Sequence, residues 1–148
     1  MDKRLVSLEL LFKALADRTR LRILGLLADG EICVCHIHES LGVTQPKASR
    51  HLAYLRRAGL VAARKDGLWV HYRLASVPDP VMQALLDAVR HAIGHLESGE
   101  KDRRRLASRV ELPTAQRAPM VTRPCCSTED RGRPALAGPG PDTLVTHN

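Results

Sequence analysis

The sequence has few aromatic residues and no long apolar segment. Aromatic residues make up 3% of the 148 residues, which argues against a surface that stacks single-stranded bases. No apolar run approaches the roughly 20 residues that a membrane-spanning helix needs. The first residues, Met1–Arg4, lead into an amphipathic stretch and lack the apolar core of a secretory signal. We therefore expect a cytoplasmic protein with no membrane partner.

The motifs of common enzymes are also missing. The sequence contains no recognisable nucleophile–base motif and no phosphate-binding glycine loop. Its four cysteines form two close pairs, Cys33/Cys35 and Cys125/Cys126. The first pair does not have the C-x-x-C spacing that thiol–disulfide enzymes place on a βαβ framework. Because close cysteine pairs in cytoplasmic proteins more often bind metals or sense redox state, we expect a binding protein and no enzyme.

Positive charge is concentrated in one segment. The formal net charge is +7 and the pI is about 9.7, which suggests an anionic partner. Between residues 44 and 74 the only carboxylate is Asp66, whereas seven side chains are basic: Lys47, Arg50, Arg56, Arg57, Arg64, Lys65 and Arg73. With so few aromatic rings available for stacking, double-stranded DNA is the expected partner.

The spacing of apolar residues predicts a mainly α-helical fold. Asp17 and Thr44 are good N-caps for the second and fourth of five expected helices. A glycine follows the end of the second, third and fourth helices. The expected helices cover about residues 5–15, 19–28, 33–41, 45–58 and 81–96.

A β-hairpin is expected after the fourth helix. Asp66-Gly67 is a two-residue turn signal, and residues 68–74 alternate as a half-buried strand requires. Two helices joined by a short connection and followed by a hairpin wing predict a winged helix-turn-helix domain, which we assign to residues 1–98. Residues 99–148 contain a basic run and then six of the nine prolines, so we expect a largely disordered tail that carries Cys125 and Cys126.

The fourth helix has one apolar and one basic face. In the major groove, the N-terminal half of such a helix faces base edges, where Gln45 suits adenine and Lys47 and Arg50 suit guanine. Cations at the hairpin tip suit phosphates. The alternative is a solvated basic surface, but the order of helix, turn, basic helix and hairpin favours DNA. The predicted DNA-binding residues are Thr44, Gln45, Lys47, Ser49, Arg50, His51, Tyr54, Arg57, Arg64 and Lys65.

From about residue 8 to residue 96 the sequence resembles the ArsR/SmtB winged-helix repressors. The resemblance rests on Leu11–Arg20, Gln45–Leu52, Leu55–Val61 and His71–Leu74. It implies a homodimer built from the first and last helices, and a bound repressor that leaves DNA when an inducer arrives. A dimer also fits an apolar stripe on the last helix that is too large for a small core to cover: Val81, Leu85, Ala88, Ala92 and Leu96. Two-fold symmetry then predicts an inverted-repeat operator.

The segment from Glu31 to Cys35 is similar to a motif in the arsenic-sensing branch of that family. In that branch two cysteines, with a third placed three residues after the second, bind arsenite or antimonite. Here the third position is His38, so the resemblance implies an As(III) or Sb(III) inducer on Cys33, Cys35 and His38. Soft thiolates suit these ions. The Cys125/Cys126 pair is a further candidate for the missing thiolate, or an incidental pair of thiols.

The sequence leaves alternatives open for the thiol site. Residues two apart point about 200° away from each other on a helix, so a chelate of Cys33 and Cys35 within a regular helix would have to unwind its turn. In a second interpretation, both cysteines are small buried hydrophobic residues with no ligand. In a third interpretation, the signal that releases the DNA is zinc or cadmium binding to the same residues, or oxidation or persulfidation of the cysteine pairs. A purely architectural DNA-binding dimer would show no ligand response.

Overall fold

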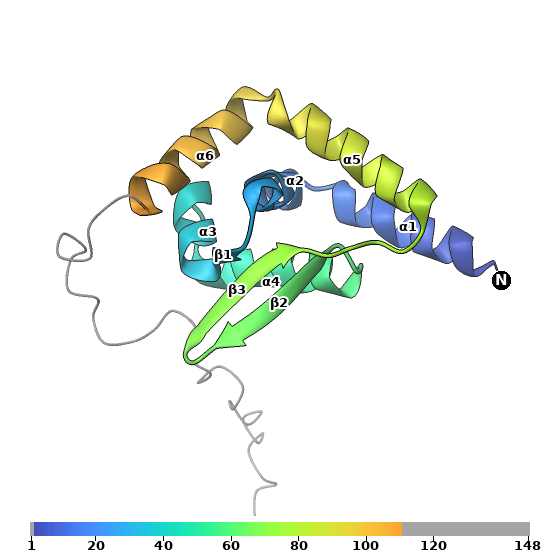
Figure 1. Ribbon diagram of the computed structural model, residues 1–148, viewed down its shortest axis with the longest axis horizontal. Coiled ribbons are helices and arrows are strands. Elements are labelled where there is room, and N and C mark those ends of the chain that lie inside the picture. Colours follow the sequence, from blue (N-terminus) through green and yellow to red (C-terminus); the bar gives the residue numbers. More distant parts are fainter. Residues whose placement is uncertain (1, 111–148) are drawn as a thin grey trace, which may run out of the picture.

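The structure is a computed structural model that describes residues 2–110 (Figure 1). It confirms a mainly helical winged helix-turn-helix fold whose small sheet has the strand order β1-β3-β2. Cys125 and Cys126, with the rest of residues 111–148, lie outside the described residues. In chain order the elements are α1 (Lys3–Leu15), α2 (Arg18–Leu26), the 3₁₀ turn η1 (Leu27–Asp29), β1 (Ile32–Cys33), α3 (Val34–Leu41), α4 (Gln45–Arg57), β2 (Val61–Asp66), β3 (Trp69–Leu74), α5 (Pro80–Gly94) and α6 (Glu97–Val110).

The second helix lies at the centre of the domain. Figure 1 shows α5 and α6 forming an arch on one side of α2, with α4 and the hairpin on the other. The predicted cap is present, because the Asp17 carboxylate accepts a hydrogen bond from the backbone N–H of Arg20 at 2.9 Å. The core joins side chains from α1, α2, α3, α4 and the residue before β2, among them Leu11, Ile23, Leu24, Ile37, Leu52, Leu55 and Leu60.

The wing is a three-stranded sheet rather than an isolated hairpin. Asp66 pairs with Trp69 across the hairpin, so the turn is Gly67-Leu68, one residue later than the predicted Asp66-Gly67. Gly67 has φ +57° and no described residue other than glycine has a positive φ, which is the pattern of a type II′ turn. The strand β1 then adds to β3 with Cys33 opposite His71. Cys33 is therefore extended, and the helix expected from residue 33 begins at Val34.

The first and fifth helices leave apolar side chains on the surface. The inward face of α5 contributes Leu86 and Ile93 to the buried residues. The helix expected to reach residue 96 ends at Gly94. Of the predicted stripe, Val81 on α5 and Leu96 just beyond it are exposed, whereas Leu85 is half-buried against the core. On α1, exposed Leu5, Leu10 and Phe12 add to this unpartnered apolar surface.

A sixth helix extends the packed domain beyond the expected boundary at residue 98. The chain turns after α5, and α6 packs against α2 and α3 (Figure 1). Gly99 permits this turn, since a Cβ atom at residue 99 would lie 2.9 Å from the carbonyl oxygen of Ile93. The basic run predicted to begin a tail is thus folded as far as Val110. None of the helices within residues 2–110 is both long and apolar enough to cross a membrane.

Candidate functional site

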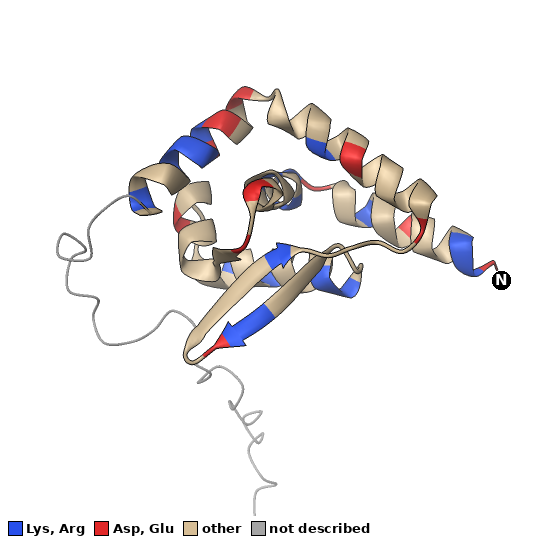
Figure 2. Cartoon of the chain, viewed as in Figure 1, with Lys and Arg blue, Asp and Glu red and all other residues tan. Residues whose placement is uncertain are grey.

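Burial on one side of α4 determines which of its side chains face outward. The Thr44 hydroxyl caps the helix by accepting a hydrogen bond from the backbone N–H of Lys47 at 3.4 Å. The predicted apolar face of Ala48, Leu52 and Leu55 is completely buried. The opposite face is exposed, and Figure 2 shows its cations on the same side of the molecule as those of β2. The exposed α4 side chains are Pro46, Lys47, Arg50, Ala53, Arg56 and Arg57.

Two further residues predicted to bind DNA contact each other. The side-chain amide of Gln45 donates to the Ser49 hydroxyl at 3.1 Å, and both residues are half-buried. This bond holds the Gln45 side chain along the first turns of α4, beside the exposed Lys47. To contact a base, the Gln45 amide must therefore break its hydrogen bond to Ser49 or use its remaining donor and acceptor atoms.

His51 turns toward the N-terminus of α2. Its Nδ1 lies 3.6 Å from the carboxylate of Asp17. Burial lowers the pKa of His51, although the Asp17 charge opposes this shift. Burial in turn would raise the pKa of Asp17, but the hydrogen bond from the backbone of Arg20 and the charge of His51 bring its net shift downward. The lowered pKa favours the neutral imidazole, and the contact with Asp17 turns this side chain toward α2.

Tyr54 also packs inward. The guanidinium of Arg20 lies 4.3 Å from the centroid of the Tyr54 ring, and that of Arg57 lies 5.4 Å from it. Arg20 is itself fixed by donating to the carbonyl oxygens of Lys13 and Ala14. The ring thus links α4 to the end of α1, while Arg57 remains exposed at the outer edge.

The wing carries three exposed cations, of which Arg64 forms ion pairs. Arg64, Lys65 and Arg73 are all exposed on β2 and β3. The Arg64 guanidinium forms an ion pair with the carboxylate of Glu31, just before β1, and lies 3.5 Å from Asp66. Arg64 accordingly lowers the pKa of Glu31. Glu31 is a residue of this surface that the sequence does not reveal, since it is far from Arg64 in the chain and the two meet only because β1 joins the wing sheet.

The two cysteines predicted to bind the inducer lie where β1 becomes α3, and Cys35 is disulfide-bonded in this structure, so inducer binding requires its reduction. Cys33 and Cys35 are 7% and 4% exposed. Cys33 is the N-cap of α3 and has extended backbone, with φ −67° and ψ 143°. The expectation that chelation must unwind a helical turn assumed that both residues are helical, and it is wrong. Bringing the two sulfur atoms onto one ion would instead act on the strand-to-helix junction between Cys33 and α3.

The third predicted ligand lies toward the other end of the same helix. His38 Nδ1 is 3.3 Å from the carbonyl oxygen of Val43, in the turn between α3 and α4. Within residues 2–110, no three His, Cys, Asp or Glu side chains gather as a group that would hold a metal ion. The described part of the chain therefore does not bring Cys33, Cys35 and His38 together as a preformed site.

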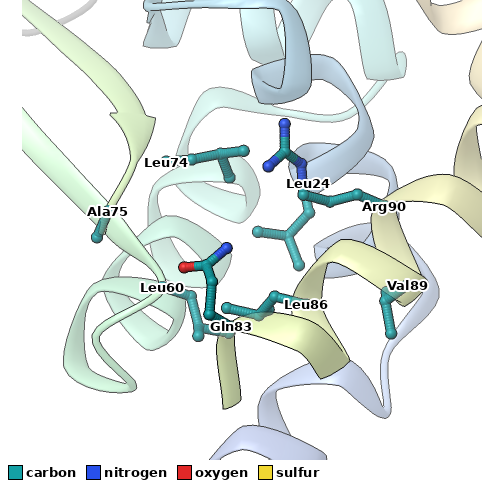
Figure 3. Close-up of a pocket in the computed structure, with 8 residues that line it drawn as sticks. All are labelled: Leu24, Leu60, Leu74, Ala75, Gln83, Leu86, Val89 and Arg90. Carbon is teal, nitrogen blue, oxygen red and sulfur yellow. The ribbon is translucent and has the colours of Figure 1, made fainter. Parts of the chain in front are cut away.

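Two cavities differ in what they can hold. One side of Cys33 lines an open pocket of about 350 Å³ with His36, His71 and Leu106 of α6. A second cavity, of about 20 Å³, lies between α2, the end of the wing and α5 (Figure 3). Its lining is mostly apolar apart from Gln83 and Arg90. It has room for one water molecule at most, so it is a packing space rather than a ligand site.

Comparison with known proteins identifies the same domain. The model of the family described as bacterial regulatory protein, arsR family, matches residues 17–63. The arsenical resistance operon repressor of Escherichia coli is 59% identical over 66 residues, covering 44% of this chain and 56% of that protein. An arsenic resistance transcriptional regulator of Pseudomonas putida is 48% identical over 84 residues, with coverages of 53% and 66%. The transcriptional activator HlyU of Vibrio cholerae is 41% identical over 86 residues, with coverages of 58% and 80%.

Solved structures agree with this assignment. HlyU from Vibrio cholerae matches with a TM-score of 0.54 at 36% identity, covering 62% of this chain and 97% of that one. A homodimeric winged helix-turn-helix domain from Mycobacterium bovis has a TM-score of 0.53 at 34% identity, with coverages of 62% and 86%. The antimony-specific repressor AntR has a TM-score of 0.52 at 30% identity, with coverages of 63% and 82%.

Fold and relatives together define the class of protein. The chain has the architecture of a winged helix-turn-helix transcriptional regulator rather than that of an enzyme. It belongs to the ArsR family of bacterial regulatory proteins. It spans 56% and 66% of the lengths of the two arsenic-resistance relatives. The match to the family model, over residues 17–63, contains α2, α3 and α4.

Proposed function

We propose that this chain is a homodimeric repressor that binds an inverted-repeat operator and leaves it when As(III) or Sb(III) binds Cys33 and Cys35. The observation that carries the proposal is the placement of both thiols at the start of α3, the helix that packs directly against the basic helix α4. A change at the thiols therefore acts on the helix that precedes the DNA-contacting one. Such a regulator acts in the cytoplasm, where its operator lies.

The DNA contact follows from the exposed cations. Lys47 and Arg50 project from the N-terminal half of α4, the part of a recognition helix that reaches base edges. Long basic side chains there suit the acceptors of guanine in the major groove. Lys65 and Arg73 extend the positive surface along the wing, where contacts to phosphates add affinity without sequence preference.

The proposed dimer uses the surface that the single chain leaves apolar. Leu5 and Phe12 of α1 and Val81 of α5 are exposed, and they belong to the two helices expected to pair. A relative of the same fold is described as homodimeric. An isologous interface of this kind makes the two α4 helices equivalent, which matches an inverted repeat.

The inducer is supported by donor chemistry and by relatives. Two thiols close in sequence suit a soft ion, and the operon repressor of Escherichia coli and AntR are named for arsenicals and antimony. We propose that the third donor is His38 or one of Cys125 and Cys126, contributed by the same protomer or by its partner.

A second signal is favoured by one observation. The imidazoles of His36 and His71 line the same pocket as Cys33, and imidazole with thiolate suits zinc or cadmium better than it suits arsenic. Oxidation or persulfidation of the thiols is the other reading of the same site. The proposed DNA contacts of α4 and the wing are the same whichever of these signals releases the repressor.

A titration of the reduced full chain on labelled DNA from upstream of its own gene tests the proposal. Fluorescence anisotropy should show tight binding, and arsenite or antimonite should release the DNA at lower concentration than zinc, cadmium or hydrogen peroxide. If only zinc or cadmium released the DNA, the inducer would be one of these metals and not a metalloid. An absence of binding to that DNA and to any other duplex would contradict the repressor function itself.

A further inference from the structure

One cation of the wing is held by a carboxylate from outside the wing hairpin. The Arg64 Nε donates to Glu31 Oε1 at 3.1 Å and to Oε2 at 3.4 Å, and its Nη2 donates to Oε1 as well. The Nε–Nη2 edge of the guanidinium, one of the two that can grip an oxyanion, is thus directed at one carboxylate. Asp66, at the hairpin tip, lies 3.5 Å from the remaining nitrogen.

This pairing has a direct consequence for DNA binding. A guanidinium binds carboxylate and phosphate with the same kind of N–H fork, so Arg64 cannot give its Nε–Nη2 edge to Glu31 and to a phosphate at once, and Asp66 lies beside the remaining nitrogen. The neighbouring Lys65 has no such partner within the described residues and stays exposed. Arg64 is therefore the wing cation whose availability depends on another side chain.

The pair is also weak enough to exchange. About half of the Arg64 side chain and more than a quarter of the Glu31 side chain are exposed to solvent. Exposed ion pairs contribute little free energy. A DNA phosphate that α4 brings close to the wing can therefore form an ion pair with Arg64 of similar free energy to that with Glu31. Because the guanidinium lowers the pKa of Glu31, the carboxylate remains charged at neutral pH and keeps competing.

Glu31 occupies this position because of the wing topology. It precedes β1, and β1 pairs with β3 so that Cys33 and Arg64 both lie opposite His71, on either side of it. This register places the start of β1 across β3 from Arg64, and the two long side chains meet by reaching over β3. Without the third strand, residue 31 would have no contact with the wing.

We propose that Glu31 competes with the DNA backbone for Arg64 and so limits the affinity of the repressor for DNA. The inference rests on the proposed DNA-binding function. Because phosphates carry no sequence information, the competition lowers affinity for all duplexes to a similar degree. It leaves the base contacts of α4 unchanged.

The test is a set of full-chain variants titrated on operator and on scrambled duplex at several salt concentrations. Glu31→Gln should tighten binding to both duplexes about two- to tenfold. It should also steepen the slope of log K against log salt concentration by about 0.9 for each wing that gains a phosphate. Asp29→Asn removes a nearby exposed carboxylate that forms no ion pair with the wing, and should change neither quantity.

The Arg64→Ala background separates competition from a general charge effect. There, the additional change Glu31→Gln should leave the salt slope unchanged and tighten binding far less, since only the charges of His71 and Arg73 then act on residue 31. Tightening of the same size in that background, or equal or weaker binding by Glu31→Gln alone, would overturn the proposal. If the unmodified chain fails to bind any duplex, the repressor function fails first, so the two failures are distinguishable.

Discussion

Arg22 of α2 and Asp102 of α6 form a two-pronged ion pair, with Nε 2.7 Å from Oδ2 and Nη2 2.6 Å from Oδ1. Asp102 is 1% exposed, and the same Nη2 also donates to the carbonyl oxygen of Leu41 at the end of α3. The pair therefore fastens α6 to two helices of the DNA-binding domain. It explains why a helix with so few apolar residues packs against the core.

Replacing Asp102 should destabilise the domain. Asp102→Ala leaves Arg22 without its carboxylate, and we expect the free energy of unfolding to fall by about 2–3 kcal/mol. This is below the full penalty for a buried pair, because Arg22 keeps the Leu41 carbonyl and reaches solvent. Urea denaturation followed by circular dichroism measures the change.

Glu100→Ala is the matched control for this prediction. Glu100 is an acid of the same helix in an ion pair with Arg104, but both side chains are exposed. We expect its loss to change the free energy of unfolding by less than about 1 kcal/mol. Equal effects of the two substitutions would mean that the Arg22–Asp102 pair does not hold α6 in place.

Arg50 should contribute more to operator binding than an equivalent cation elsewhere. Arg50→Ala removes an exposed guanidinium from the recognition helix, and we expect operator binding to weaken by about 1–3 kcal/mol. Arg104→Ala, which removes the same group from α6, should leave the dissociation constant nearly unchanged. An electrophoretic mobility shift titration compares them, and similar losses would argue against α4 as the reading helix.

His51 should make stability depend on pH. Burial lowers its pKa from the ordinary value of 6.5, so below pH 6.5 the unfolded chain binds a proton that the folded chain resists. The free energy of unfolding should therefore fall as the pH decreases from 6.5 toward the lowered pKa. His51→Gln should flatten this part of the pH profile, as measured by thermal denaturation between pH 5 and pH 7. An unchanged profile would show that other groups cause the dependence.

The apolar surface of α1 and α5 should control the oligomeric state. Val81→Glu places a charge in the proposed dimer interface and should give monomers in sedimentation velocity experiments. Leu68→Glu is a matched control, because Leu68 is also 62% exposed but lies at the tip of the wing. A dimer that tolerates Val81→Glu, or one that dissociates only with Leu68→Glu, would place the interface elsewhere.

Features that depend on local sequence were predictable. Asp17 and Thr44 cap helices as expected, and the apolar face of α4 is buried as its spacing predicts. The hairpin was expected, but its turn is shifted to Gly67-Leu68 because glycine serves equally well as the first or the second central residue of a turn.

Features that depend on distant residues were not predictable. The inward face of α6 consists of Gly99, Asp102 and Leu106, whose helical spacing escapes notice because only one of them is apolar. Its burial depends on Arg22, far away in the chain. The strand β1 has only two residues, too few for an alternating pattern, and without it neither the extended Cys33 nor the Glu31–Arg64 pair would be expected.

The most direct measurement compares two cysteine variants for arsenite-driven release from operator DNA. Cys33→Ser/Cys35→Ser should bind the operator as tightly as the unmodified chain and stay bound at arsenite concentrations that release it. Cys125→Ser/Cys126→Ser, which removes the same number of thiols, should still respond, with reduced sensitivity if either supplies the third donor. Release of the Cys33→Ser/Cys35→Ser variant at the same arsenite concentration as the unmodified chain would contradict an inducer site at the start of α3.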